Sequence, residues 1–377
     1  MHIKTVPTPA AIIDLARMNA NITRMQKHIQ ELGAAFRPHG KTAKCLQVAQ
    51  KQLQAGAQGM TASTLKEAEH FFAAGISDII YAVGIVPAKL PQALQLVKRG
   101  CALKLLTDNE QSARNIALFG LQNKSCLEVL IEIDCDGHRS GVAPEAPELL
   151  AIAHALEHNG GARLAGVLTH AGSSYEFSDP GQLETLAEQE RALCVRAATR
   201  LREAGFACPI VSIGSSPTAL RSAKLAGISE VRAGVYVFFD LVMHNVGVCS
   251  MDEIALSVLC SVIGHQQEKG WALVDAGWMA MSRDRGSARL GTDFGYGQVC
   301  GLDGCPLPGY IVSAANQEHG IISLAGGVDT EIATRFPIGS LLRILPNHAC
   351  ATGAQFPAYY ALAKNGECQL WPRFYGW

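Results

Sequence analysis

The sequence of 377 residues predicts an α/β fold, a (β/α)8 barrel followed by a C-terminal β domain. From residue 34 to about residue 240, short apolar strands alternate with amphipathic helices in eight strand–helix steps. After about residue 245, strand-like segments separated by Gly, Pro and Asp turns replace this alternation. A doubly wound open sheet ranks second, because no GxGxxG sequence follows the first strand.

The elements follow in order along the chain. The eight barrel strands are expected at residues 34–39, 59–63, 78–83, 103–108, 127–134, 164–170, 209–214 and 230–234. Helical patterns such as TLKEAEHFFAAG and PELLAIAHALEHNG lie between them. The β domain is expected to contain strands in IALSVLCSVIGH, WALVDAGWMAM and SLLRILPNH. We therefore expect a barrel over residues 16–245 and a β domain over 246–377, to which residues 1–15 add a strand.

Composition excludes several classes of partner. Hydrophobic residues make up 48% of the chain and charged residues 17%, and the net charge is −1. Without a basic stripe or an acidic tail, neither nucleic acid nor an anionic membrane is an expected partner. No apolar run reaches the ~18 residues of a membrane helix, and the first residues lack a secretory apolar region. The missing secretory region predicts a cytoplasmic location. In a cytoplasmic chain the 12 cysteines, which form no CxxC pair, are expected to be mostly buried thiols.

A lysine stands directly after the first barrel strand, in the segment RPHGKTAK. The carboxyl ends of barrel strands carry the active site, so Lys41 is a candidate nucleophile toward an aldehyde. Arg37, His39 and Lys44 lie nearby, and neighbouring cations lower the pKa of a lysine. The alternative is a solvated basic turn.

Small and hydroxyl residues follow strands seven and eight, in SIGSSPTAL and EVRAGVYVFFD. Barrels of this class often bind a phosphate there through main-chain N–H groups and a helix N-terminus. The alternative is ordinary N-capping by Ser and Thr. A phosphate site together with a strand-end lysine indicates pyridoxal 5'-phosphate (PLP). The candidate phosphate ligands are Gly214, Ser215, Ser216, Thr218, Gly234 and Val235.

Strands five and six end in further polar groups. In IEIDCDGHRSGV, Arg139 is a candidate to bond the cofactor ring oxygen or a carboxylate, and an ion pair with Asp134 or Asp136 is the alternative. In LTHAGSSY, His170 is placed to stack on a pyridine ring and Tyr175 to donate a hydrogen bond. A core histidine that satisfies a loop is the alternative for His170.

The β domain adds a histidine and a cysteine two positions apart, in LPNHACAT. In an extended strand His348 and Cys350 would project from one face, as a metal ion requires. A buried pair without metal is the alternative. Glu318 and His319 in NQEHG are candidates for an acid–base or supporting role, although such residues are more often structural.

These motifs, in this order, resemble the D-threonine aldolase / D-serine dehydratase group, a fold-type III PLP family with an alanine-racemase-like barrel. The resemblance runs from about residue 7 to the final WPRFYGW. It implies that Lys41 binds PLP as a Schiff base, that SIGSSPT and RAGV hold the phosphate, and that Tyr175 lies in the cofactor pocket. It also implies that His348 and Cys350 bind a divalent metal whose other positions are left to water and substrate.

The group contains two lyase chemistries. One dehydrates a β-hydroxy D-amino acid such as D-serine or 3-hydroxyaspartate to a 2-oxo acid and ammonia, and the other is retro-aldol cleavage to glycine and an aldehyde. Thiolate favours Zn²⁺, whereas the Asp expected here in the aldolases favours Mn²⁺ or Mg²⁺. Cys350 therefore predicts a zinc-dependent dehydratase.

A racemase and a non-catalytic PLP-binding protein rank below these two lyases. A racemase has no evident use for a metal, and non-catalytic PLP-binding proteins are typically the barrel alone. The resemblance also implies a homodimer. A second substrate carboxylate has Arg139, Arg283 and His319 as candidate partners, among which the sequence does not choose.

Overall fold

The computed structural model describes all residues, Met1–Trp377. The chain divides into two compact units, which we describe separately. One contains Arg24–Gly234 and Phe374–Trp377, and the other contains Met1–Thr23 and Val235–Arg373. No helix in the structure combines the length and the apolar character needed to cross a membrane.

The first unit contains a barrel of eight parallel strands in the order β2-β9-β8-β7-β6-β5-β4-β3. A bridge between His39 and Thr61 joins the two end strands, so the sheet closes on itself. The predicted barrel is confirmed, the open sheet is wrong, and each predicted strand lies within two residues of an observed one. The strands are β2 (Ala35–Pro38), β3 (Met60–Ala62), β4 (Asp78–Gly84), β5 (Ala102–Thr107), β6 (Leu127–Ile133), β7 (Ala162–Thr169), β8 (Ile210–Ile213) and β9 (Glu230–Ala233).

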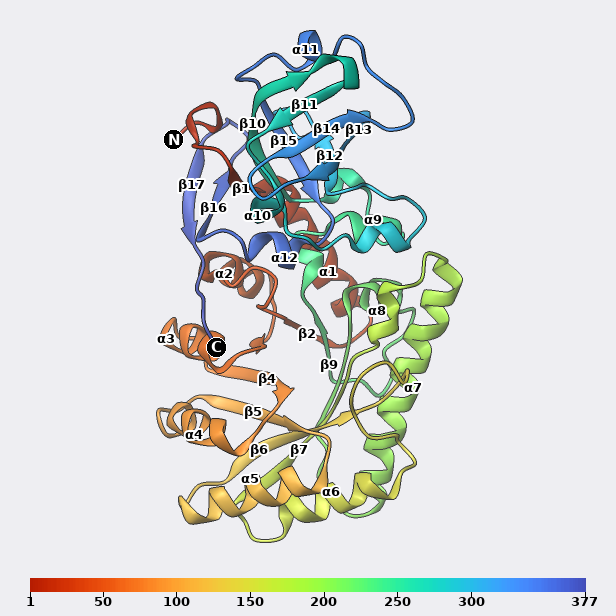
Figure 1. Ribbon diagram of the computed structural model, residues 1–377. Coiled ribbons are helices and arrows are strands. Elements are labelled where there is room, and N and C mark those ends of the chain that lie inside the picture. The colour runs from red at the N-terminus through yellow and green to blue at the C-terminus, as the bar shows by residue number, and fades with distance from the viewer. The chain divides into compact units, whose positions relative to one another are not determined.

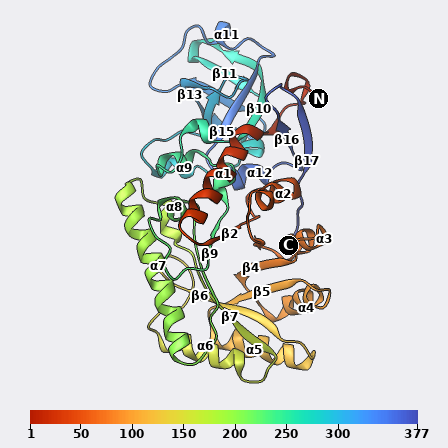
Figure 2. The ribbon, with the colours of Figure 1, turned by 180° about the vertical axis from the view of Figure 1, so that it is seen from behind.

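Helices cover the outside of the barrel, and the long α7 lies along it in both views (Figures 1 and 2). The strands are therefore buried on both faces, which is why they read as short apolar runs. Side chains begin several helices: Thr64 accepts from the N–H of Glu67, and Asn109 from that of Ser112. The helices are α2 (Leu46–Gln54), α3 (Leu65–Ala73), α4 (Leu90–Lys98), α5 (Glu110–Gln122), α6 (Pro147–Glu157), α7 (Pro180–Glu203) and α8 (Ser216–Arg221).

The second unit is built on a nine-stranded sheet in the order β11-β14-β13-β12-β15-β10-β1-β16-β17. An additional β10–β11 pairing closes six of these strands into a ring, and β1, β16 and β17 extend it. Its strands are β1 (Ala10–Asp14), β10 (Leu256–Gln266), β11 (Trp271–Val274), β12 (Gly297–Cys300), β13 (Pro306–Ala315), β14 (Gly320–Leu324), β15 (Leu341–Pro346), β16 (Ala358–Leu362) and β17 (Cys368–Pro372).

The N-terminal residues form part of this sheet, because β1 pairs antiparallel with β10 and parallel with β16. Ile3, Ile12 and Leu259 pack in one buried cluster beside these pairings. Helix α1 (Leu15–Glu31) follows β1 directly. The strand expected throughout WALVDAGWMAM is wrong in its second half: β11 stops at Val274, and Trp278–Met281 form the short helix α10. The remaining helices are α9 (Leu241–Asn245), α11 (Ile332–Arg335) and α12 (Ala349–Gly353).

Candidate functional site

Lys41 lies in the loop that leaves the carboxyl end of β2. Main-chain hydrogen bonds fix this loop to the neighbouring strands: His39 N–H donates to Ala233 O (2.8 Å) and Gly40 N–H to Thr61 O (2.8 Å). The Lys41 side chain is exposed at this end of the barrel. The loop therefore presents a primary amine at the face where barrels bind their substrates.

Two of the cations expected to act on Lys41 are already neutralised by ion pairs. Arg37 pairs with Glu230 (2.8 Å) and Asp78 (2.9 Å), and Lys44 pairs with Glu67 (3.1 Å). The basic segment is thus not a cluster of unpaired charges. The alternative of a solvated basic turn is also wrong for Arg37, which is buried.

Two histidines lie within electrostatic reach of Lys41 and are held neutral. Burial, followed by the positive charges of Lys41 and Arg232, lowers the pKa of His39 well below its usual range. Burial also lowers the pKa of His170 to about 3, and the charges of Lys41, Arg232 and Arg139 act in the same direction. These groups therefore face one region at the mouth of the barrel.

The ring of His170 is oriented by a main-chain carbonyl. Its Nδ1 lies 2.9 Å from Gly214 O, and since a carbonyl only accepts, Nδ1 carries the proton. The Tyr175 ring lies 6.1 Å from the His170 ring, centre to centre, at 45°. The structure thus brings together the residues predicted after strands six and seven.

The segment after β8 makes a tight, buried turn into α8. Gly214 has φ +132°, and a Cβ there would lie 2.1 Å from Arg232 O, so a side chain is excluded. Ser215 Oγ accepts from Thr218 N–H (3.2 Å), and Thr218 Oγ1 accepts from Ser215 N–H (3.1 Å). The N-capping alternative thus correctly describes these two hydroxyl groups.

The turn also suits a phosphate. Ser216 is fully buried at the first position of α8, where main-chain N–H groups have no helical acceptor. A Cβ on Gly234 would lie 3.1 Å from Thr42 Oγ1 and 3.3 Å from His39 O, so glycine at the end of β9 allows the loop after β2 to pack closely against it. Val235 follows at the start of a 3-10 turn, Val235–Val237. A strand-end lysine, a neutral imidazole and a glycine-lined helix start fit the groups of PLP.

Arg139 lies in a loop whose carboxylates bind main-chain groups. Asp134 Oδ1 accepts from the N–H groups of Asp136 (3.1 Å) and Gly137 (2.7 Å), and Asp136 Oδ2 accepts from Ser173 N–H (2.9 Å). Neither carboxylate pairs with Arg139, so the ion-pair alternative is wrong.

Two buried charged residues of this region are absent from the sequence prediction. Glu190 on α7 accepts through Oε1 from Ala171 N–H (3.0 Å) and Gly214 N–H (3.1 Å), and so ties together the segments after β7 and β8. Arg232 on β9 donates to Ser212 Oγ (2.8 Å) and to Thr169 O. A charged residue within an apolar helical stripe, or within a buried strand, is the signal that would have found each.

The second unit contains the predicted histidine–cysteine pair, but not in a strand. β15 ends at Pro346, His348 is the residue before α12, and Cys350 lies in the first turn of that helix. The argument from one face of an extended strand is therefore wrong. The two side chains nevertheless meet, since His348 and Cys350 form a side-chain hydrogen bond.

Asp284 orients the ring of His348. Its Oδ2 lies 2.6 Å from His348 Nδ1. Burial alone would lower the pKa of His348, but the hydrogen bonds to Asp284 and Cys350 raise it to about 11. Because Asp284 binds Nδ1, the Nε2 atom is left for a metal, and a carboxylate in this position is typical of metal-binding histidines.

Asp240 fixes the main chain beside the pair. It is buried, caps α9 by accepting from Met243 N–H (2.9 Å), and accepts from Ala349 N–H (2.8 Å) through its other oxygen. No third His, Cys, Asp or Glu completes a closed site. An imidazole and a thiolate with open positions fit a catalytic divalent metal rather than a structural one.

The other candidates of the β domain have separate positions. Glu318 and His319 are exposed in the turn between β13 and β14, where Gln317 donates to Glu318 (3.2 Å). The guanidinium of Arg283 stacks over the Trp278 ring at 4.1 Å.

Known protein families match the chain over two separate stretches. Residues 13–242 match the alanine racemase N-terminal domain family, and residues 255–362 match a serine dehydratase domain. The chain belongs to the family that combines these two domains. The predicted resemblance and the alanine-racemase-like barrel are confirmed.

Individual relatives of named activity indicate the class of reaction. The chain is 62% identical, over 99% of its length and 98% of the relative's, to D-threo-3-hydroxyaspartate dehydratase of Delftia sp. (strain HT23). A cysteine-to-alanine variant of D-threo-3-hydroxyaspartate dehydratase in its metal-free form has a structure with a TM-score of 0.99 and 61% identity, covering 100% of both chains. D-threonine aldolase of Arthrobacter sp. is 29% identical, over 92% of this chain and 86% of the relative. The protein is thus a lyase of the dehydratase type, as predicted, and the aldolases are more distant relatives.

Proposed function

We propose that the protein is a PLP- and zinc-dependent dehydratase that converts D-threo-3-hydroxyaspartate, D-serine or both to a 2-oxo acid and ammonia. The observation that carries this proposal is the His348–Cys350 pair with Asp284 on the far ring nitrogen. When bound, PLP supplies an electron sink for a Cα carbanion, and the metal supplies a Lewis acid for a departing hydroxyl. Loss of water leaves an enamine, which hydrolyses to the 2-oxo acid and ammonia.

We assign the cofactor cradle to the barrel residues. Lys41 would hold the cofactor through its primary amine and accept the substrate Cα proton, and the neutral ring of His170 would pack against the pyridine. The main-chain N–H groups of the turns at Gly214 and Gly234 would bind the phosphate. We also assign to the cofactor site, from the family resemblance, the residues Arg139, Tyr175, Ser215, Thr218 and Val235. The proposed domains are a cofactor barrel over residues 16–245 and a β domain with the metal pair over residues 246–377, to which residues 1–15 add a strand. The compact units of the structure divide the chain at nearby positions, after Thr23 and after Gly234.

Zinc is proposed from the donor chemistry. A thiolate is a soft ligand and, together with imidazole, favours Zn²⁺ over Mn²⁺ or Mg²⁺. Purified protein should therefore contain zinc by elemental analysis. Cys350→Asp replaces the soft donor by a hard one and should shift the metal that restores activity toward Mn²⁺. An active, demonstrably zinc-free wild-type protein would refute this assignment.

Product analysis tests the reaction. With D-threo-3-hydroxyaspartate and with D-serine we expect a 2-oxo acid and ammonia, and EDTA should stop their release. Lys41→Ala should lose the visible absorbance of lysine-bound PLP, whereas Lys44→Ala, which removes a lysine of the same loop, should retain it. Glycine plus an aldehyde as products, or an unchanged absorbance in Lys41→Ala, would contradict the proposal.

A cytoplasmic homodimer is the proposed form of the enzyme. None of the twelve cysteines forms a disulfide, which suits a reducing compartment. The family resemblance suggests the dimer. Light scattering on purified protein would test the dimer, and fractionation of cells would test the compartment.

A further inference from the structure

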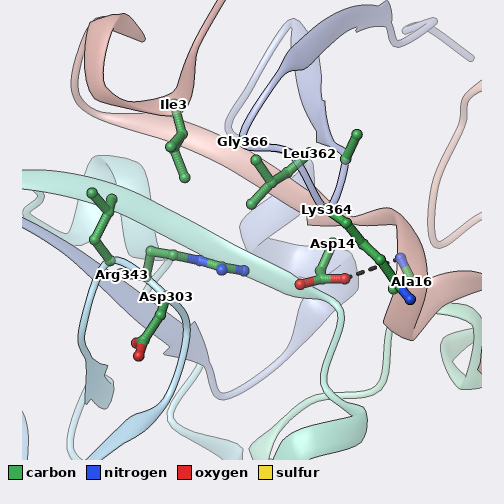
Figure 3. A pocket seen from close by; sticks show the side chains of 10 residues that line it. Ile3, Asp14, Ala16, Asp303, Arg343, Leu362, Lys364 and Gly366 are labelled. Carbon is green, nitrogen blue, oxygen red and sulfur yellow. Dashed lines mark hydrogen bonds between the residues drawn. The ribbon is translucent and has the colours of Figure 1, made fainter.

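A cavity of about 400 Å³ lies in the second unit, beside the nine-stranded sheet (Figure 3). Charged residues of both signs line it: Asp14 and Asp303, and Arg343 and Lys364. Apolar side chains, among them those of Leu302 and Leu362, complete the wall. None of these residues belongs to the proposed cofactor or metal sites.

Arg343 on β15 is the unusual member of the lining. Its side chain has 0% exposed surface, and its Nε donates to Ser257 Oγ (2.9 Å). Its two terminal nitrogens, Nη1 and Nη2, are buried without a hydrogen-bond partner. A buried guanidinium with two unpaired ends is costly, so a ligand that pairs with it gains more than it would at the surface.

The neighbouring turn is shaped to receive this guanidinium. Gly304 has φ +81°, and a Cβ there would lie 2.5 Å from Arg343 Nη1. Burial lowers the pKa of Arg343. The charge of Asp14 and, more weakly, that of Asp303 oppose this effect, whereas the positive charge of Arg17 adds to it. The site therefore contains the Arg343 guanidinium, whose charge Asp14 and Asp303 offset without hydrogen bonds to it. Its Nη1 and Nη2 atoms donate no hydrogen bond.

The two carboxylates do not hydrogen-bond Arg343. Asp14 Oδ1 accepts from the N–H groups of Ala16 (3.0 Å) and Arg17 (3.1 Å), and Asp303 Oδ1 accepts from Cys305 N–H (2.9 Å). In Figure 3 the guanidinium extends between Asp303 and Asp14. Asp14 Oδ2 also lies 3.8 Å from Arg17 Nε in an ion pair, and each carboxylate still has lone pairs for a further donor.

We propose that this cavity is a second site, which binds a free α-amino acid. The ligand carboxylate pairs with Nη1 and Nη2 of Arg343 and with the Lys364 ammonium, and the ligand ammonium is accepted by Asp14 and Asp303. A small apolar side chain packs on Leu302 and Leu362. An inorganic anion would satisfy the cations alone, whereas a zwitterion complements both signs of charge in the lining.

Binding requires a rearrangement in the wall, because Arg343 has no exposed surface. Lys364 is exposed, in the turn between β16 and β17, and its long side chain has the freedom to move aside and then close on the ligand carboxylate. This inference does not depend on the proposed reaction, since the site uses none of the groups assigned to that reaction.

The test is binding of L-alanine to the full-length holoenzyme, by calorimetry and by the shift in melting temperature. Arg343→Met removes an unpaired buried charge, so the variant should melt no lower than wild type. It should bind L-alanine about tenfold or more weakly. Binding that Arg343→Met retains in full belongs to another site and would overturn the proposal, as would a wild-type protein that binds no L-alanine.

Two further comparisons test the role of Lys364 and the role of the two carboxylates separately. Lys364→Met changes an exposed residue and should weaken binding, whereas Lys98→Met, an exposed lysine on α4, should not. Propionate has the carboxylate without the ammonium and should bind more weakly than L-alanine. Equal binding of propionate would overturn the role of Asp14 and Asp303, and equal effects of the two lysine variants would overturn that of Lys364.

Discussion

Replacement of Glu190 by alanine tests the buried contact that shapes the barrel mouth. Glu190 is fully buried on α7, and its Oε1 accepts from Ala171 N–H (3.0 Å) and Gly214 N–H (3.1 Å). Ala171 follows His170, and Gly214 both begins the proposed phosphate turn and orients the His170 ring. Removal of the carboxylate therefore disturbs two predicted cofactor segments at once.

The magnitude follows from the donors left behind. Glu190→Ala leaves two buried main-chain N–H groups without an acceptor, at a cost of about 1–3 kcal/mol each. We expect a loss of about 2–6 kcal/mol in the free energy of unfolding, together with weaker retention of PLP. Glu190→Gln keeps an accepting oxygen at nearly the same volume and should lose about 1 kcal/mol or less.

The pH dependence distinguishes the carboxylate from the amide. Burial raises the pKa of Glu190, and hydrogen bonds from Thr218, Ala171 and Gly214 oppose this only in part. A raised native pKa means that the contribution of Glu190 to stability is fully present below its ordinary pKa of 4.5 and is lost as the pH rises through the native value. Because glutamine does not ionise, Glu190→Gln should gain stability relative to wild type as the pH rises above 4.5.

Urea unfolding of the holoenzyme at pH values below and above 4.5 measures the free energy of unfolding, and PLP absorbance reports retention of the cofactor. The control is Glu184→Ala, since Glu184 is exposed on the same helix. The reasoning fails if Glu190→Ala unfolds within about 0.5 kcal/mol of wild type, the range of an ordinary surface change.

Three other changes have defined outcomes. Asp284→Asn should weaken metal retention by about 10- to 100-fold in a chelator competition, while Asp293→Asn, which breaks an exposed ion pair, should not. His170 stays neutral to about pH 3, so wild type should lose stability as the pH falls from 6.5 toward 3, and His170→Asn should lose less over that range in acid unfolding. Phe374 stacks on His70 at 4.7 Å and is 8% exposed; Phe374→Ala should therefore cost about 3 kcal/mol in urea unfolding, and a change below about 1 kcal/mol would contradict this.

The barrel could be predicted from the sequence because each of its strands is a short apolar run with a helix after it. Burial on both faces produces that pattern directly, and the eight predicted ranges agree with the structure within two residues. The β domain was harder. WALVDAGWMAM is an almost continuous apolar run, interrupted only by Asp275 and Gly277, but the strand ends at Val274 and Trp278–Met281 form a helix. A pattern of apolar residues this short does not distinguish a strand from a helical turn.

The residues that support the site could not be predicted in the same way, because each acts through a contact with a residue that is far away in the sequence. His348 and Asp284 are 64 residues apart, and Glu190 and Gly214 are 24 apart. Single-sequence motifs indicate which groups have reactive chemistry, such as Lys41 and Cys350. The partners that hold such groups in position are defined only by the folded chain.

The His348–Cys350 pair illustrates the difference between reactive groups and the residues that hold them in position. An imidazole next to a thiol has two ring nitrogens, and the sequence NHAC leaves open which one faces Cys350. Asp284 settles that choice by binding Nδ1, and Asp240 holds the start of α12 through Ala349 N–H. Neither carboxylate is needed to propose a metal from sequence, yet without them the ring would be free to rotate and the helix start free to shift. The geometry of the proposed metal pair therefore depends on four residues, of which the motif contains two.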